Sequence, residues 1–200
     1  MGERAEIAPA TRAWERIDTA RLTLRRPTAA DAEAIFRSYA SDPEVTLYVG
    51  FPRHQRVGDT RAFLEFSEAQ WAKWPAGPYV ILRRDTGALI GGSGLKFDSP
   101  VCAATGYVLA RSAWGAGFAT EALRAMVDVA RHQRVQRLYA VCHVDHRASA
   151  HVLEKGGFTL EGTLRRYAEF PNLAPGLLCD VLCYSRIFEI LSGTEGEMRS

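Results

Sequence analysis

A Gly-x-Gly turn is the feature of this sequence that points most directly to chemistry. Gly115 and Gly117 stand between a predicted strand that ends near Ala110 and a predicted helix that begins near Gly117. Glycine permits positive φ and a close approach of the backbone to an anion. The first turn of a helix adds unpaired N–H groups at the positive end of its dipole. The pattern predicts a phosphate or pyrophosphate site, although a plain strand-to-helix turn would look the same.

Residues around this turn exclude two other phosphate motifs. The Lys-Ser or Lys-Thr pair of a nucleotide P-loop is absent, and Thr120 stands where a dinucleotide fingerprint has its third glycine. Arg111 is expected to add positive charge at the rim of the turn.

A second polar group follows the next predicted strand. His143, Asp145 and His146 cluster at the end of that strand, and Ser149 lies early in the short helix after it. A histidine with a pKa near 6.5 suits a general base at neutral pH, and a serine hydroxyl can assist a departing group. Two plainer interpretations remain open: His146 as a polar loop residue and Ser149 as a helix cap.

No metal is expected. His143, His146 and His151 do not match the spacings of common zinc sites. The four cysteines form no C-x-x-C pair and are interpreted as reduced thiols: Cys102, Cys142, Cys179 and Cys183.

Alternating strands and helices must position these groups. Periodicity and turn residues predict strands at 21–25, 79–83, 88–97, 105–110, 138–144, 158–164 and 177–188, and helices at 28–41, 58–74, 117–130 and 147–155. The order predicts a mixed α/β sheet with one clear βαβ unit around the glycine turn. The expected organisation is a tail at 1–17, one domain at 18–190 and a second tail at 191–200.

Composition places further limits on function. The chain has 200 residues, 47% of them hydrophobic, and a formal net charge of +2. That charge argues against a nucleic-acid partner, and no apolar stretch approaches the roughly 20 residues of a membrane helix. We expect a cytoplasmic protein, monomeric or homodimeric, with no membrane partner.

Two blocks resemble a known family. Trp114 to Ala122 resembles motif A of the GCN5-related N-acetyltransferases (GNAT), nearest to the ribosomal-protein-alanine acetyltransferase (RimJ/RimL-type) branch. Ala148-Ser149 with Val152 to Phe158 resembles motif B, and Arg21 to Arg25 resembles the first strand. The resemblance spans residues 18–190. It implies a mostly antiparallel twisted sheet of about seven strands with four helices, splayed between the fourth and fifth strands, and acetyl-CoA as co-substrate.

The resemblance also implies the cofactor site. Backbone groups of Val108 and Leu109 would pair with the pantetheine arm, and the N–H groups of residues 115–120 would hold the pyrophosphate. The implied cofactor residues are Val108, Leu109, Arg111, Trp114, Gly115, Ala116, Gly117, Phe118, Ala119, Thr120, His146, Ser149 and Lys155.

Catalytic residues implied by the resemblance are Ser149 and His146. Ser149 is the expected proton donor to the thiolate, because Leu153 stands where the family often has a tyrosine. His146 replaces a common asparagine, and Ala104 stands near the place of the glutamate most readily cast as base. The expected reaction is acetylation of a primary amine, on a peptide N-terminus or a small molecule. The alternative is a non-catalytic acyl-CoA-binding module.

Overall fold

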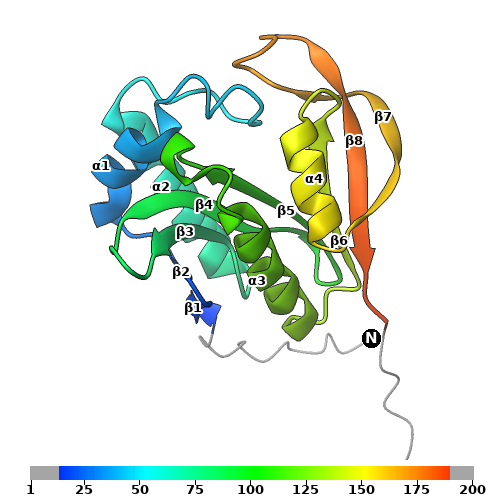
Figure 1. The fold of residues 1–200 in the computed structure, drawn as a ribbon, viewed down its shortest axis with the longest axis horizontal. Coiled ribbons are helices and arrows are strands. Elements are labelled where there is room, and N and C mark those ends of the chain that lie inside the picture. Colours follow the sequence, from blue (N-terminus) through cyan, green and yellow to red (C-terminus); the bar gives the residue numbers. More distant parts are fainter. Residues whose placement is uncertain (1–13, 190–200) are drawn as a thin grey trace, which may run out of the picture.

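One eight-stranded sheet organises the molecule, and the computed structural model describes residues 14–189 of it (Figure 1). The strand order is β1-β2-β3-β4-β5-β6-β8-β7, and every neighbouring pair is antiparallel except β5 with β6. The strands are β1 (Arg16–Asp18), β2 (Leu22–Arg25), β3 (Pro78–Arg83), β4 (Leu89–Ser99), β5 (Cys102–Leu109), β6 (Arg137–His143), β7 (Thr159–Glu169) and β8 (Leu178–Ile187). The mixed, mostly antiparallel sheet is as predicted.

The sheet has one strand more than the seven predicted, and this additional strand is β1, at the edge of the sheet. It pairs Arg16 with Arg25 and begins inside the segment predicted as a tail at 1–17. Three residues are too few to reveal an alternating pattern, so this strand depends on its partner rather than on its own sequence. Residues 1–13 of the first predicted tail, and residues 190–200, which include the whole second predicted tail at 191–200, lie outside the described part of the chain.

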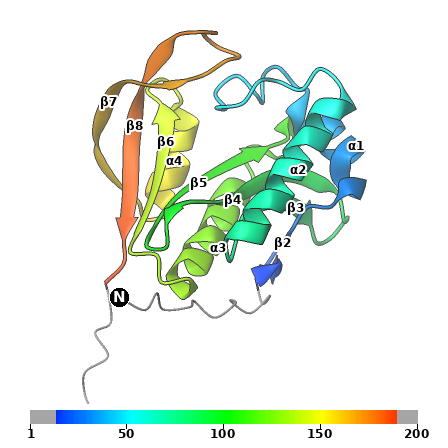
Figure 2. The ribbon, with the colours of Figure 1, turned by 180° about the vertical axis from the view of Figure 1, so that it is seen from behind.

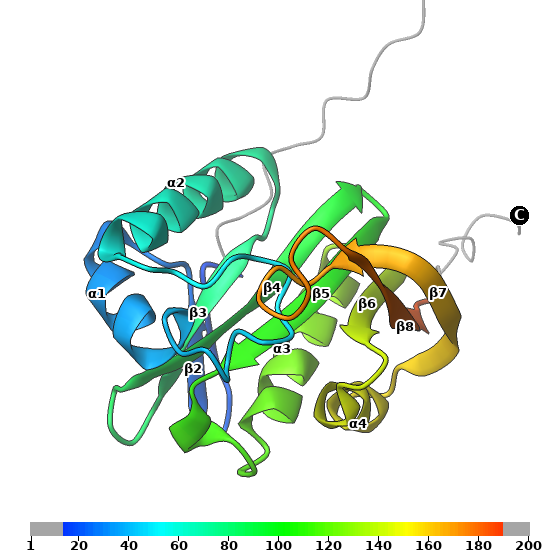
Figure 3. The ribbon, with the colours of Figure 1, turned by 90° about the horizontal axis from the view of Figure 1, so that it is seen from above.

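Four α-helices cover the sheet: α1 (Ala32–Ile35), α2 (Val57–Lys73), α3 (Phe118–His132) and α4 (Arg147–Lys155). Helices α1 and α2 lie on one face, and α3 and α4 on the other (Figure 3). The segment predicted as the first helix contains three helix types in succession: a 3₁₀ turn, then α1, then the π-helix Phe36–Ala40. Within residues 14–189, no helix has both the length and the apolar character to cross a membrane.

Helix α3 anchors the core. Ala122, Leu123, Met126, Val127 and Ala130 are buried, as their three- and four-residue spacing predicts. Gly156, the cap of α4, lets the two helices approach, since a Cβ there would lie 2.5 Å from Leu123 Cδ2. The core therefore fixes where α3 and α4 begin.

Strands β5 and β6 separate soon after they start. They pair only over Cys102–Ala104 and Arg137–Tyr139. Beyond that point β5 continues along β4 to Leu109, whereas β6 follows β8 to His143, and the two diverge (Figures 1 and 2). These are the fourth and fifth of the predicted strands, so the expected splay is confirmed.

Candidate active site

The glycine turn joins the free end of β5 to α3. Gly115 has φ 73° and Gly117 has φ 80°, the left-handed conformation that favours glycine. Gly117 is also the N-cap of α3. Trp114 fastens the turn to the strand, because its Nε1 donates to Leu109 O at 2.8 Å. Both glycines are therefore required by the backbone path.

The turn presents a row of free donors. In the described part of the chain, the N–H groups of residues 115–120 meet no protein acceptor, and the first helical bond runs from Glu121 N to Gly117 O at 3.1 Å. The turn is mostly solvent-exposed. Converging N–H groups at a helix N-terminus fit a pyrophosphate, so the residues present suit the cofactor that the sequence implies.

Glu121 lies in the first turn of α3 but turns away from this cradle. It accepts hydrogen bonds from Thr19 Oγ1 at 2.6 Å, Arg21 N at 2.8 Å and Arg21 Nε at 2.7 Å. Burial acts to raise its pKa, but the bonds from Thr19 and Arg21 outweigh burial and hold the pKa below its usual value. Glu121 is thus an anchored anion rather than a repulsive one at the cradle.

Arg21 is the cation at the cradle, and sequence reasoning missed it. Its Nη1 donates to Ala116 O at 2.9 Å, and its guanidinium carbon lies 4.5 Å from the centroid of the Phe118 ring. The sequence showed Arg21 only as the start of the first strand, 96 positions from Gly117. No local signal links the two, because the sheet and α3 bring them together.

Arg111, which is predicted to add charge at the rim of the turn, has two acidic partners in the structure. Its side chain pairs with Asp42 at 3.3 Å and with Glu44 at 2.6 Å. Both carboxylates belong to the loop 41–56 between the π-helix and α2. They neutralise Arg111 and fasten that loop to the end of β5.

The register of β5 bears on the predicted pantetheine contacts of Val108 and Leu109. Ala110 N donates to Ile90 O at 2.8 Å, and Val108 lies opposite Gly92. Because backbone groups alternate sides along an antiparallel strand, Val108 directs its N–H and C=O to β4. Tyr107 and Leu109 direct theirs to the side where β6 has departed, although Trp114 already occupies the Leu109 carbonyl.

Ser149 lies in the first turn of α4 and faces β5. The Tyr107 hydroxyl lies 2.9 Å from Ser149 O and 3.0 Å from Ser149 Oγ. The N-cap of α4 is His146, and no side chain caps it. The hydroxyl of Ser149 therefore does not act as a helix cap. Sequence reasoning missed Tyr107, whose position across the opening requires the tertiary fold.

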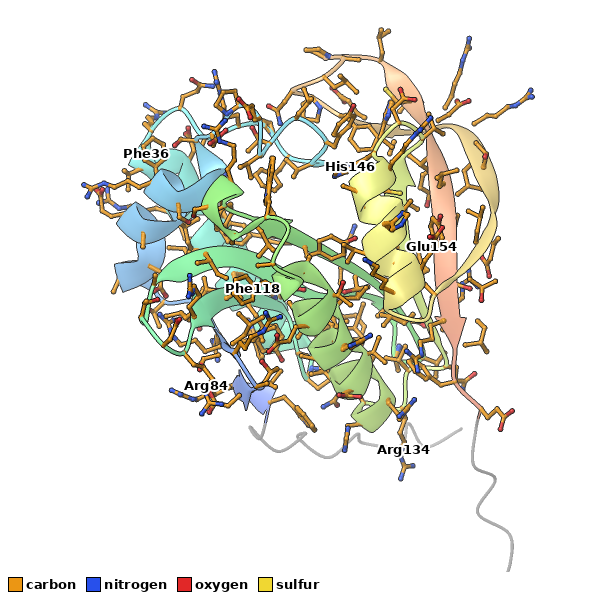
Figure 4. All side chains as sticks on the ribbon, viewed as in Figure 1. Phe36, Arg84, Phe118, Arg134, His146 and Glu154 are labelled. Carbon is orange, nitrogen blue, oxygen red and sulfur yellow. The ribbon has the colours of Figure 1, made fainter. Side chains whose placement is uncertain are left out.

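His146 stands at the start of α4, on the side facing loop 41–56 (Figure 4). Its ring stacks on Tyr48 with centroids 4.7 Å apart and an interplanar angle of 19°. Burial lowers the pKa of His146, and the charge of His143 lowers it further. The imidazole is thus neutral over most of the range near pH 7 and can accept a proton.

His143 completes the cluster that the sequence predicted. It is buried on β6, its Nδ1 accepts from Asp145 N at 3.2 Å, and its ring lies 5.2 Å from Tyr48 and 5.1 Å from Phe170. The N–H bond to Nδ1 leaves the proton of a neutral ring on Nε2. Strand β6, loop 41–56 and the β7–β8 connection thus meet around His146.

Asn172 holds the two loops of this region together. It donates from Nδ2 to Thr46 O at 2.7 Å and to Phe51 O at 2.9 Å, and accepts from Arg53 N at 2.8 Å. Loop 41–56 therefore reaches from η4 (Arg111–Ala113) across to the β7–β8 connection (Figure 3). The sequence placed the acceptor side in these loops but contained no motif that predicted the clasp.

Lys155 lies at the last turn of α4, near the cradle. Arg124 Nη2 donates to Lys155 O at 3.1 Å. Together with Arg21, Gly117 and Thr120, both residues line an open groove of about 870 Å³ along α3. Three cations thus border the cradle on its outer side.

Comparison with known proteins identifies the chain. A family model described as an acetyltransferase (GNAT) domain matches residues 21–159. The chain belongs to the GNAT acetyltransferase family. The N-acetyltransferase p20 of Bacillus licheniformis is 31% identical over 174 residues, covering 86% of this chain and 95% of the relative. The N-acetyltransferase YoaA of Bacillus subtilis is 34% identical over 154 residues, covering 76% and 86%.

Solved structures agree with this GNAT fold. RimL, a ribosomal L7/L12 α-N-protein acetyltransferase, superposes with a TM-score of 0.75 at 25% identity, covering 87% of this chain and 94% of RimL. The microcin C7 self-immunity acetyltransferase MccE, in complex with acetyl-CoA and AMP, gives a TM-score of 0.76 at 21% identity, covering 85% and 94%. The likeness to MccE shows the fold alone.

Replacing Gly117 with valine in this GNAT acetyltransferase should abolish binding of acetyl-CoA. A β-branched residue resists φ 80° and moves the N–H groups of the cradle. Gly87 has φ 69° in the β3–β4 turn, so Gly87→Val carries similar backbone strain away from the cradle. Calorimetric titration with acetyl-CoA should show no binding for Gly117→Val and normal binding for Gly87→Val. Normal affinity in the Gly117 variant would contradict the cradle.

Replacing Asn172 with alanine should loosen loop 41–56 and raise KM for the amine by about tenfold, since three hydrogen bonds to that loop are lost. The Kd for acetyl-CoA should stay within about twofold, because the cradle lies on other elements. Steady-state kinetics and titration measure the two constants. Asn172→Asp keeps the oxygen that accepts from Arg53 N and serves as the graded control; an unchanged KM in both variants would refute the clasp.

Proposed function

We propose that this acetyltransferase transfers the acetyl group of acetyl-CoA to a primary amine, with a chain-terminal α-amine as the favoured acceptor. The supporting observation is one opening, between the diverging β5 and β6, that has the N–H cradle at one end. Ser149 and His146, at the start of α4, stand at the other end. An opening that has both an anion site and a hydroxyl with an imidazole suits group transfer better than anion binding alone.

The cofactor is held by groups of this chain in three places. The N–H groups of residues 115–120 bind the pyrophosphate, with Arg21 beside them. Backbone groups of Tyr107 and Leu109 face the opening and would pair with the pantetheine arm, and Lys155 of the outer groove would be available to the adenosine end. When bound, acetyl-CoA supplies an activated acetyl thioester.

His146 accepts the proton of the amine. Its pKa lies below the ordinary value of about 6.5, so the imidazole is available as a base at neutral pH. An α-ammonium has a pKa of about 7.7–8, whereas a lysine ammonium has one of about 10.4. The pKa mismatch with His146 is about 2.5 units larger for lysine, which is why an α-amine is the favoured acceptor.

Ser149 donates to the departing sulfur. Its hydroxyl stands on the first turn of α4 at the opening, where the Tyr107 hydroxyl holds it at 3.0 Å. Residues 147–155 contain no other hydroxyl. The similarity to RimL, whose name assigns it an α-N-protein acetyltransferase activity, also supports the acceptor proposed.

Thiol release from acetyl-CoA should identify the acceptor. Peptides with free Ala, Ser or Met N-termini should be turned over, whereas the same peptides with blocked N-termini and one internal lysine should not. Turnover of small amines alone would move the acceptor to a small molecule. The absence of turnover across the whole panel, with acetyl-CoA still bound in a titration, would replace the enzyme by a non-catalytic acyl-CoA-binding module.

Replacing His146 with asparagine tests whether His146 acts as the general base or only contacts the cofactor. Asparagine keeps a polar side chain and caps a helix well, so binding of acetyl-CoA should persist. For the parent protein, kcat should rise with pH through a limb centred below about 6.5, because the base form is the deprotonated one and the pKa of His146 is lowered. The variant should lose this limb and about 100-fold or more in kcat. A retained limb would exclude His146 as the base.

A further inference from the structure

Tyr107 is the side chain that crosses the opening. It lies on β5 three residues beyond Ala104, the last residue that pairs with β6. From there its hydroxyl reaches α4 and contacts both the carbonyl oxygen and the hydroxyl of Ser149, at 2.9 Å and 3.0 Å. The ring is only partly buried. No other strand sends a hydroxyl to Ser149 among the bonds of residues 14–189.

The two contacts constrain where the proton of Ser149 points. A carbonyl oxygen only accepts, and a phenol carries one proton and can both donate and accept. When Tyr107 donates to Ser149 Oγ, the proton of Ser149 is free to point into the opening. When Tyr107 donates to the carbonyl, Ser149 Oγ is still held at 3.0 Å. Either arrangement restricts the rotation of the Ser149 side chain.

Tyr107 acts in this pair as a neutral phenol. Burial raises its pKa well above the usual value, and the hydrogen bond with Ser149 only partly opposes this. The group therefore keeps its proton at physiological pH and does not act as a base. Its contribution to a reaction is to hold and orient the serine hydroxyl.

We propose that Tyr107 is a positioning residue that aligns the Ser149 hydroxyl with the departing sulfur of acetyl-CoA. This inference rests on the proposed donor role of Ser149. It differs from a purely structural role in one respect: the hydroxyl of Tyr107 matters to the rate only while Ser149 has a hydroxyl to align.

A double-mutant cycle tests this difference. Tyr107→Phe keeps the ring and removes the hydroxyl, and should lower kcat by about tenfold with the Kd for acetyl-CoA within about twofold. In a Ser149→Ala background, the same change should have no further effect on kcat. The measurements are kcat at saturating amine, titration with acetyl-CoA and the midpoint of thermal unfolding for all four proteins.

Tyr139→Phe is the matched control. Tyr139 is also partly buried, its hydroxyl makes one bond of 2.8 Å to Asp98, and it lies in the paired part of β6. This variant should keep kcat. If Tyr107→Phe proves unstable, Tyr107→Leu removes the same hydroxyl, and 3-fluorotyrosine at 107 keeps the hydroxyl and should keep the rate.

Each outcome has a separate meaning. An equal loss of kcat in both backgrounds would make Tyr107 a structural residue and overturn the inference. If Ser149→Ala lowers kcat while Tyr107→Phe leaves kcat unchanged, the inference is overturned but the proposed function remains in place. A Ser149→Ala variant with normal kcat would remove the donor role of Ser149 and the inference with it.

Discussion

The divergence of β5 and β6 after three paired residues is the constraint on which the site depends. It leaves backbone N–H and C=O groups along both strands without ladder partners, and an unpaired buried group costs about 1–3 kcal/mol. The chain compensates in part at the end of β5, where the indole of Trp114 donates to Leu109 O, and the Tyr107 hydroxyl bridges the opening to Ser149 O of α4. The opening is therefore a stable part of the fold rather than a defect in the sheet.

Loop 41–56, which places Tyr48 on His146, is held by two attachments of different strength. Arg111 joins it to the end of β5 through solvent-exposed ion pairs, which water and salt screen. Asn172 joins it to the β7–β8 connection through three hydrogen bonds, each worth about 0.5–1.5 kcal/mol. The loop therefore depends mainly on Asn172 for its position over His146, and the ion pairs set its direction.

The fold gives the two ends of the opening different electrostatic character. Glu121, which shares the first turn of α3 with the cradle, is directed to Thr19 and Arg21, so its negative charge is balanced away from the phosphate site. At the other end, burial beneath Tyr48 favours the neutral form of His146. One end of the opening thus suits an anion and the other a proton acceptor.

The sequence by itself determined the mixed sheet, the βαβ unit, the glycine turn and the bounds of α4, because these depend on local spacing and backbone freedom. It also brought His143 and His146 together, since they are neighbours in the chain. It could not determine the three-residue strand β1, the role of Arg21 or the contact of Tyr107 with Ser149. It predicted Arg111 at the rim of the turn but gave no sign of its ion pairs with Asp42 and Glu44. The contacts of Arg21 and Tyr107 join residues 95 and 42 positions apart in the chain, and only the tertiary structure decides which residues meet at that separation.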